Sequence, residues 1–225
     1  MPKAIRDNAL SIFFGVIFLA ALIGQSIAGY IQNNEELTQH SQPAVSFGEF
    51  ITSSDFIVDV AENWQSEFLQ FLLFIAATIW LVQRGSPESK KPGDEGLDTD
   101  EKQKDGAFAD PTSPEWAKRR GLPRVIFSNS LLLVMGAIFL LSWYAQSLAG
   151  TVVMNAENAQ HGQAAITWLE YLGSAEFWNR TLQNWQSEFL AVGSMIAFSI
   201  FLRQRGSSES KPVGTPHGES STEAE

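Results

Sequence analysis

Two long stretches without a charged side chain constrain the fold of this chain more than any other feature. Residues 8–30 and 125–156 contain no Lys, Arg, Asp or Glu. An uncharged apolar run of about 18 or more residues is typical of a transmembrane helix, whereas a surface helix of a soluble protein carries charges along its exposed face. The two stretches therefore predict helices that cross a membrane.

The first stretch also resembles a secretory signal, with Lys3 and Arg6 in front and Ser26-Ile27-Ala28 as a small-residue cleavage site. However, the run is longer than the ~7–15 apolar residues of such a signal. A related "SLAG" also recurs at 147–150, inside the chain. A retained membrane helix is the favoured interpretation.

The chain repeats itself. Shifted by 121 residues, 8–90 aligns with 129–211 without a gap, and 37 of the 83 positions are identical. The identities include polar and aromatic pairs in register: Asn8 and Asn129, Gln25 and Gln146, His40 and His161, Trp64 and Trp185. Chance similarity between two apolar segments would match Leu and Ile instead, so the pattern indicates a tandem duplication.

Each copy is expected to hold two spans joined by a polar outer loop. Repeat 1 covers 1–86, with spans at about 9–30 and 64–83 around loop 31–63. Repeat 2 covers 122–207, with spans at about 126–150 and 185–204 around loop 151–184. The segments 87–121 and 208–225 are rich in polar residues and have no apolar period, which predicts a disordered linker and a disordered tail.

Local signals suggest where the helices begin and end. Asn8 and Asn129 stand just before the first span of each copy, where a short polar side chain suits an N-cap. Gln-Arg-Gly at 83–85 and 204–206 is expected to end the second span, with a cation followed by a C-cap glycine.

Basic residues predict the orientation in the membrane. Of the 15 Lys and Arg, only Arg180 falls in an outer loop, and the rest lie in the termini, the linker or the adjoining span ends. Because Lys and Arg favour the cytoplasmic side, both termini and the linker should be cytoplasmic. Two spans per copy insert both copies the same way up. The predicted fold is all-α, a four-transmembrane-helix bundle built from two tandem parallel helical-hairpin repeats.

The motif "NWQSEFL" occurs at 63–69 and again at 184–190, and places a glutamate at the start of each second span. The uncharged part of the second copy, Phe189–Leu202, is ~21 Å long as a helix, against a hydrocarbon core of ~30 Å. The span therefore reaches across only if "NWQSE" is helical too. Glu67 and Glu188 then lie about one turn below the outer surface, with Trp64 and Trp185 as anchors at the level of the headgroups.

Three interpretations of these glutamates stay open. In the first, they are first-turn residues that complement the helix dipole. They can instead form intramembrane polar pairs, Gln25 with Glu67 and Gln146 with Glu188, since each glutamine lies at the matching depth. They can also line an ion or substrate pathway. In a further geometry, the two carboxylates face each other and resist joint ionisation.

A metal site is a weaker hypothesis. Glu36 and His40 match Glu157 and His161, and two copies could supply four ligands. Known Glu-x-x-His pairs of di-metal bundles are spaced by three, whereas these are spaced by four and lie in a polar loop. A solvated loop is favoured, and no cofactor is expected.

Two further segments carry a membrane signal. "SFGEFITSSDF" at 46–56 matches "TWLEYLGSAEF" at 167–177, and the recurring aromatics predict a short helix in the outer interface. "KRRGLPR" at 118–124 groups four cations before the third span. This group is interpreted as a topology signal, with anionic-lipid binding as the alternative.

The stretches "GQSIAG" at 24–29, "EFITSSDF" at 49–56, "NWQSEFLQ" at 63–70 and "QRGSPESK" at 83–90 resemble a family of small bacterial integral membrane proteins. That family is catalogued as a domain of unknown function. The resemblance covers the chain outside linker and tail. It implies the bacterial inner membrane and a four-helix protein, and it brings no activity, ligand or catalytic residue.

Composition narrows the function. The chain has no cysteine and a net charge of −10, which argues against thiol chemistry and nucleic-acid binding. It carries no nucleophile, metalloprotease, phosphate-loop or dinucleotide motif. The expected function is a non-enzymatic structural or interaction role in the bilayer, with a homo-oligomer or another membrane protein as partner. A component of a small-solute or ion transporter or channel is the first alternative, and a membrane enzyme is the second.

Overall fold

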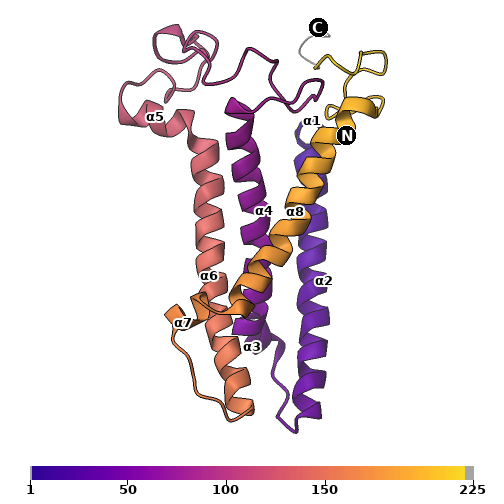
Figure 1. Cartoon of the computed structure of the whole chain (residues 1–225), viewed down its shortest axis with the longest axis vertical. Helices are drawn as coiled ribbons and strands as arrows, with labels where there is room; N and C mark the ends of the chain where they lie inside the picture. The colour runs from indigo at the N-terminus through magenta and orange to yellow at the C-terminus, as the bar shows by residue number, and fades with distance from the viewer. Residues whose placement is uncertain (1, 221–225) are drawn as a thin grey trace. The chain divides into compact units, whose positions relative to one another are not determined.

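The structure is a computed structural model that describes residues 2–220 (Figure 1). Its regular elements in that range are all helical, which confirms the all-α prediction. They are α1 (Lys3–Asp7), α2 (Ala9–Gln39), α3 (Phe47–Ile51), α4 (Ser54–Trp80), the 3₁₀ helix η1 (Gly106–Phe108), α5 (Leu122–Ser128), α6 (Ser130–Gln160), α7 (Trp168–Leu172) and α8 (Ala175–Phe201). The end of the predicted tail, 221–225, lies outside the described residues.

The helices of the two similar stretches coincide in length and position. The helices α2, α3 and α4 have α6, α7 and α8 as counterparts, each beginning and ending 121 residues later. The short helices α3 and α7 lie within the two segments where the aromatic pattern predicts them. Equivalent sequence therefore adopts equivalent local structure in both copies.

Two helices in the described part of the chain, α2 and α6, are long and apolar enough to cross a membrane. Each has 31 residues, or ~46 Å of helix, and so extends well past the expected outer ends at 30 and 150. The predicted outer loops are therefore helical at their starts, over 31–39 and 151–160. In each copy, an asparagine near the end of the long helix bonds the chain segment that returns after it. Asn34 accepts a hydrogen bond from the Val45 N–H at 2.8 Å and donates to the Val45 carbonyl at 3.1 Å.

Asn155 makes the same pair of hydrogen bonds with Ile166, at 2.8 and 2.9 Å. A side-chain amide has both a donor and an acceptor, so it can bond the N–H and the carbonyl of one backbone residue at once, as a neighbouring strand would. The recurrence of asparagine at these two positions thus has a structural cause.

The starts of α2 and α6 differ from the expected N-caps. Asn8 occupies the N-cap position of α2, but its side chain makes no capping bond. It donates instead to the Ala4 carbonyl at 2.8 Å, and Asn129 donates likewise to the Val125 carbonyl at 2.8 Å. The reason is that a short helix, α1 or α5, precedes each asparagine, and the amide satisfies a carbonyl at its end.

The ends of α4 and α8 also differ from expectation. The helices stop at Trp80 and Phe201, so the prediction that Gln-Arg-Gly caps them is wrong. The segment 83–90 forms a separate turn, which we call the signature turn. In it the Gln83 N–H donates to Ser89 Oγ at 2.7 Å, and the Glu88 N–H donates to Ser86 Oγ at 3.2 Å.

The signature turn recurs at 204–211 with the same two hydrogen bonds. The Gln204 N–H donates to Ser210 Oγ at 2.9 Å, and the Glu209 N–H donates to Ser207 Oγ at 3.1 Å. The glycine of each turn has φ +85°, a left-handed conformation that glycine adopts without strain. The seven shared letters of "QRGSxESK" therefore encode a turn.

Acidic side chains of the two signature turns meet. Burial raises the pKa of Glu88, and so do the charge of Glu209 and its hydrogen bond to Glu88. A carboxyl that is hydrogen-bonded to another carboxyl holds a shared proton more firmly. The predicted linker, 87–121, overlaps the end of the signature turn and contains η1 and several turns. Its flexibility stays a prediction.

The chain forms two compact units. Unit 1 comprises 1–60 and 145–171, and unit 2 comprises 61–144 and 172–225. In unit 1, each short helix packs an aromatic ring on a glycine of a long helix. A Cβ placed on Gly29 would lie 2.9 Å from Phe50 Cζ, and one on Gly150 would overlap the Tyr171 hydroxyl.

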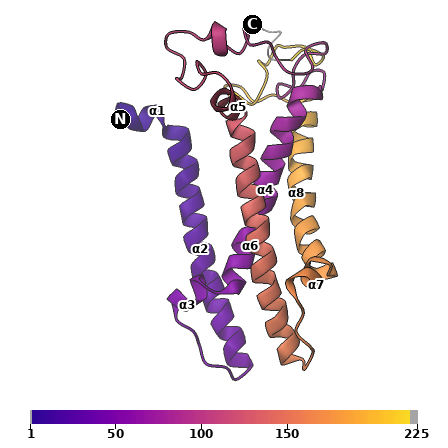
Figure 2. The same cartoon turned by 90° about the vertical axis from the view of Figure 1, so that its left-hand side faces the viewer.

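Unit 2 brings α4 from Ala61, α6 up to Tyr144 and α8 side by side (Figure 2). The helices α4 and α8 run parallel, because Glu62 meets Arg180 near their starts while Ser86, beyond the end of α4, meets Ser199 near the end of α8. The helix α6 runs the opposite way and packs Gly136 against Leu72 of α4.

Candidate functional site

Unit 2 contains a layer of polar and aromatic side chains between α4, α6 and α8. We call it the polar–aromatic layer. Its members are Glu62, Gln65, Trp143, Phe177, Arg180, Thr181 and Trp185. Polar groups within a helical bundle are costly unless paired, so the pairing of each member indicates what the layer can do.

Gln65 and Trp185 form the central hydrogen bond of this layer. The Trp185 indole N–H donates to Gln65 Oε1 at 2.8 Å. Gln65 is 0% exposed, and its Nε2 has no hydrogen-bond partner in the described part of the chain. One copy of "NWQSEFL" thus supplies the tryptophan and the other supplies the glutamine.

An ion pair between Arg180 and Glu62 forms part of the polar–aromatic layer. Arg180 donates from Nη1 to Glu62 Oε2 at 3.1 Å, and its Nε lies 3.5 Å from Glu176 Oε1. The Arg180 and Glu62 side chains are largely shielded, at 32% and 20% exposure. The pair ties the first third of α4 to α8 and neutralises the one cation that the sequence places in an outer loop.

Aromatic rings fill the space beside these polar groups. Trp143 of α6 stacks on Phe177 at a centroid distance of 6.0 Å and meets Trp185 at 6.1 Å. The Trp143 indole N–H points to Thr181 Oγ1 at 3.4 Å, and Thr181 is fully buried. Such packed, hydrogen-bonded side chains hold three helices in register.

The two glutamates of the repeated motif lie inside their helices. Glu67 and Glu188 each stand 13 residues after the first residue of α4 or α8. The interpretation that they are first-turn residues is therefore wrong. The geometry in which the two carboxylates face each other stays a prediction.

The glutamines of the first helices belong to unit 1. Gln25 is half-buried. Gln146 is 0% exposed, and neither of its amide atoms has a hydrogen-bond partner in the described part of the chain. The pairing of Gln25 with Glu67 and of Gln146 with Glu188 stays a prediction, and so does the role of Trp64 and Trp185 as membrane anchors.

The four residues considered for a metal lie at the ends of the first long helices rather than in loops. Glu36 accepts a hydrogen bond from Gln32 at 3.0 Å, and His161 Nδ1 lies 2.9 Å from the Glu157 carbonyl. Within residues 2–220, no group of three or more His, Asp or Glu is suited to hold a metal ion. At the C-cap of α2, the His40 backbone N–H donates to the Glu36 carbonyl at 3.1 Å.

Three residues of the polar–aromatic layer were not predicted as site residues, and the sequence marked Arg180 only as the one cation of an outer loop. Trp143, Arg180 and Thr181 replace Leu22, Asp59 and Val60 of the first copy. All three meet in one layer of unit 2. Positions where the two copies differ in side-chain type, from aliphatic to aromatic or polar or from acidic to basic, were the signal that could have identified them.

These features define the class of the protein: all-helical, with two helices that are long and apolar enough to cross a membrane. The chain belongs to the family described as "Domain of unknown function (DUF6766)", which matches residues 1–222. No curated protein and no solved structure matches the chain.

Proposed function

We propose that the chain is a multi-pass membrane protein in which α4 and α8 cross the bilayer as well as α2 and α6. If α2 and α6 insert the same way up, as their similar sequences and flanking cations favour, the chain between them must return across the membrane. The helix α4 is the long helix in that interval. With 27 residues it reaches ~40 Å, more than the ~30 Å hydrocarbon core.

The parallel packing of α4 and α8 supports this topology. Two tandem hairpins inserted the same way up place their second helices parallel to one another, with the first helices antiparallel to them. Unit 2 has this arrangement for α4, α8 and the first half of α6. The proposed location is the bacterial cytoplasmic membrane, with both termini and the linker in the cytoplasm.

The short helices α3 and α7 suit the outer surface of the bilayer. Phe47, Trp168 and Leu169 are exposed on them. The side chain of the capping residue, Ser46 or Thr167, accepts from the Glu49 or Glu170 N–H, and each glutamate accepts from the capping residue's N–H. A short capped helix with exposed aromatics lies favourably at the headgroup level.

Within the membrane we propose a non-enzymatic structural or interaction role. The observation that carries it is the filled interior of unit 2. Gly136 lets Leu72 approach α6 closely, and Phe139 and Trp143 are packed between the helices. Side chains at native packing density close such a space to solutes.

A transport component is the second candidate. Gln65 Nε2 and both amide atoms of Gln146 have no partner among the described residues, and they favour it because buried polar groups without protein partners often hold water or a solute.

A flux assay on the purified chain in liposomes separates the two functions. We expect Na⁺, K⁺ and proton flux equal to that of protein-free liposomes. Flux above this background that is lost in Gln146→Leu, yet kept in the exposed control Gln42→Leu, would instead establish the transport function.

A further inference from the structure

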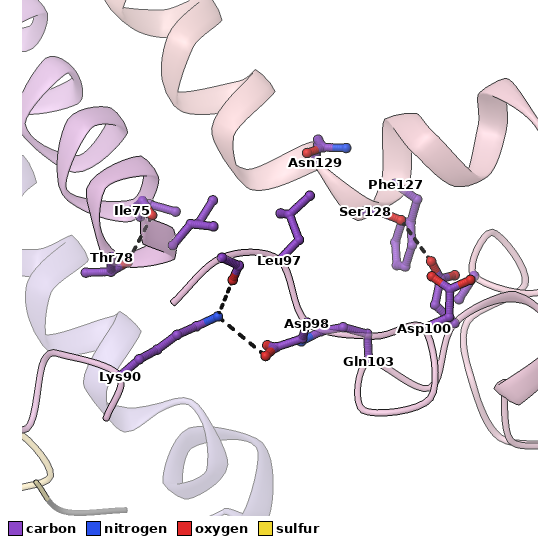
Figure 3. Close-up of a pocket in the computed structure, with 14 residues that line it drawn as sticks. Ile75, Thr78, Lys90, Leu97, Asp98, Asp100, Gln103, Phe127, Ser128 and Asn129 are labelled. Atoms are coloured by element: carbon purple, nitrogen blue, oxygen red, sulfur yellow. Dashed lines mark hydrogen bonds and ion pairs between the residues drawn. The ribbon is translucent and has the colours of Figure 1, made fainter. Parts of the chain in front are cut away.

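Unit 2 contains a pocket of about 530 Å³ between the end of α4, the junction of α5 and α6, and the linker. Ile75, Thr78 and Ile79 of α4 line one side, and Phe127 and Ser128 line the other (Figure 3). The linker closes the third side, where the Gly96 N–H donates to the Ile79 carbonyl at 2.7 Å. The size falls within the range of small-molecule sites.

The rim of the pocket carries both signs of charge. Asp98, Asp100 and Asp105 line it together with Lys90. Lys90 Nζ donates to the Gly96 carbonyl at 2.8 Å and lies 3.4 Å from Asp98 Oδ1. Because an ammonium group has three N–H donors, one N–H of Lys90 stays available to a ligand oxygen.

Two carboxylates of the rim, Asp100 and Asp105, differ in how accessible they are to a ligand. Arg124 donates from Nε to Asp105 Oδ2 at 2.8 Å and also binds Asp100. This guanidinium holds the pKa of Asp105 below its usual range, so the carboxylate is charged at neutral pH. Its Oδ1 is shielded from solvent and accepts no hydrogen bond within 2–220, while Asp100 is 57% exposed.

Apolar side chains of the pocket are open to the surroundings. Leu97 is 79% exposed, and Phe127 is exposed as well. Figure 3 shows Leu97 between the charged linker and the helices. Exposed apolar groups beside a charged rim fit an amphiphile, whose chain covers them while its headgroup meets the charges.

We infer that this pocket binds the headgroup of an aminophospholipid of the phosphatidylethanolamine type. The inference rests on the proposed function, which places the end of α4 at the cytoplasmic surface of the bilayer. The primary ammonium of the lipid donates to the exposed carboxylate of Asp100. Its phosphate accepts from Lys90, and its first methylenes cover Leu97 and Phe127.

The charge pattern distinguishes this lipid from other bilayer lipids. Phosphatidylcholine has the same net charge and similar chains, but its methylated ammonium cannot donate a hydrogen bond to a carboxylate. Phosphatidylglycerol brings only a negative charge, which the three aspartates of the rim repel. Matched lipids therefore separate the contribution of the N–H donors from that of chains and net charge.

The test is a lipid titration of the purified full chain in nonionic detergent, read by native mass spectrometry. We expect phosphatidylethanolamine to bind about tenfold more tightly than phosphatidylcholine, as fits one charge-assisted hydrogen bond, and phosphatidylglycerol to bind most weakly. Equal binding of phosphatidylethanolamine and phosphatidylcholine, or tightest binding of phosphatidylglycerol, overturns the inference. Either result leaves the proposed membrane topology intact. A wrong topology, by contrast, overturns the proposed function and the inference together.

Variants locate the site. Asp100→Asn should reduce phosphatidylethanolamine binding to the level of phosphatidylcholine. Because Asp100 also binds Arg124, Leu97→Ser, which removes no ion pair, provides the independent test through the apolar wall. The matched controls are Asp94→Asn and Leu202→Ser, at exposed positions outside the pocket. Unchanged lipid preference in Asp100→Asn and Leu97→Ser contradicts the proposed site.

Discussion

Replacing Gly150 by alanine should lower the free energy of unfolding by about 1–3 kcal/mol, as overpacking of a close contact does. The Cβ would overlap the Tyr171 hydroxyl and lie 2.7 Å from Tyr171 Cζ. Tyr171 is 0% exposed, so its ring has no free space to enter. The loss outweighs the gain of ~0.5–1 kcal/mol that alanine normally brings to a helix interior.

Two glycines provide the comparison. Gly29→Ala meets Phe50 Cζ at 2.9 Å without the hydroxyl overlap, and should cost less. Gly193→Ala, in the interior of α8 with nothing within 4 Å of its Cβ, should stabilise by ~0.5–1 kcal/mol. Unfolding in SDS titrations measures all three. If Gly150→Ala were as stable as Gly193→Ala, the close packing of α7 on α6 would be refuted.

Replacing Trp185 by phenylalanine should cost about 1–3 kcal/mol, because it leaves a fully buried acceptor unpaired. Gln65 Oε1 loses the indole N–H that donates to it at 2.8 Å. Gln65 Nε2 already has no partner among the described residues. Gln65 is 0% exposed, so bulk water cannot replace the lost donor and the amide oxygen stays unsatisfied.

A double-mutant cycle isolates this contact. Gln65→Leu removes the acceptor, and Gln65→Leu with Trp185→Phe removes both partners, so the pair should show coupling of about 1 kcal/mol or more. Trp80→Phe is the control: Trp80 is 56% exposed at the end of α4, and its replacement should change stability by less than ~0.5 kcal/mol. Coupling indistinguishable from zero would show that the hydrogen bond does not hold α4 to α8.

The sequence predicted the helical class and the short helices α3 and α7, but it misplaced the ends of the long helices. Apolar runs mark the thickness of a membrane, not the length of a helix. The helix α2 therefore continues to Gln39, beyond the expected limit at residue 30. Likewise α4 begins at Ser54, ten residues before Trp64.

The sequence contains a local signal for the starts of α4 and α8. Ser53 Oγ accepts from the Phe56 N–H, and Ser174 Oγ accepts from the Phe177 N–H. Serine followed by an acidic residue in the first turn is a regular helix start. Helix starts placed at these two serines predict that Glu67 and Glu188 lie inside their helices.

Most of the polar–aromatic layer could not be derived from one sequence. The partners Gln65 and Trp185 are 120 residues apart, and Glu62 and Arg180 are 118 apart. Sequence periodicity identifies the face of a helix but not the helix that packs against it. Only the departures from the repeat, such as Trp143 for Leu22, point toward the layer.

The measurement that tests the four-span account most directly is the labelling of single cysteines with a membrane-impermeant maleimide in intact cells. Because the chain contains no cysteine, each introduced thiol reports one position. The sites are Gln42→Cys after α2, Thr112→Cys in the linker and Gln163→Cys after α6. We expect Gln42→Cys and Gln163→Cys to be labelled from outside, and Thr112→Cys only after permeabilisation. Labelling of Thr112→Cys from outside together with protection of Gln163→Cys would mean that α4 does not cross the membrane, and would contradict the account.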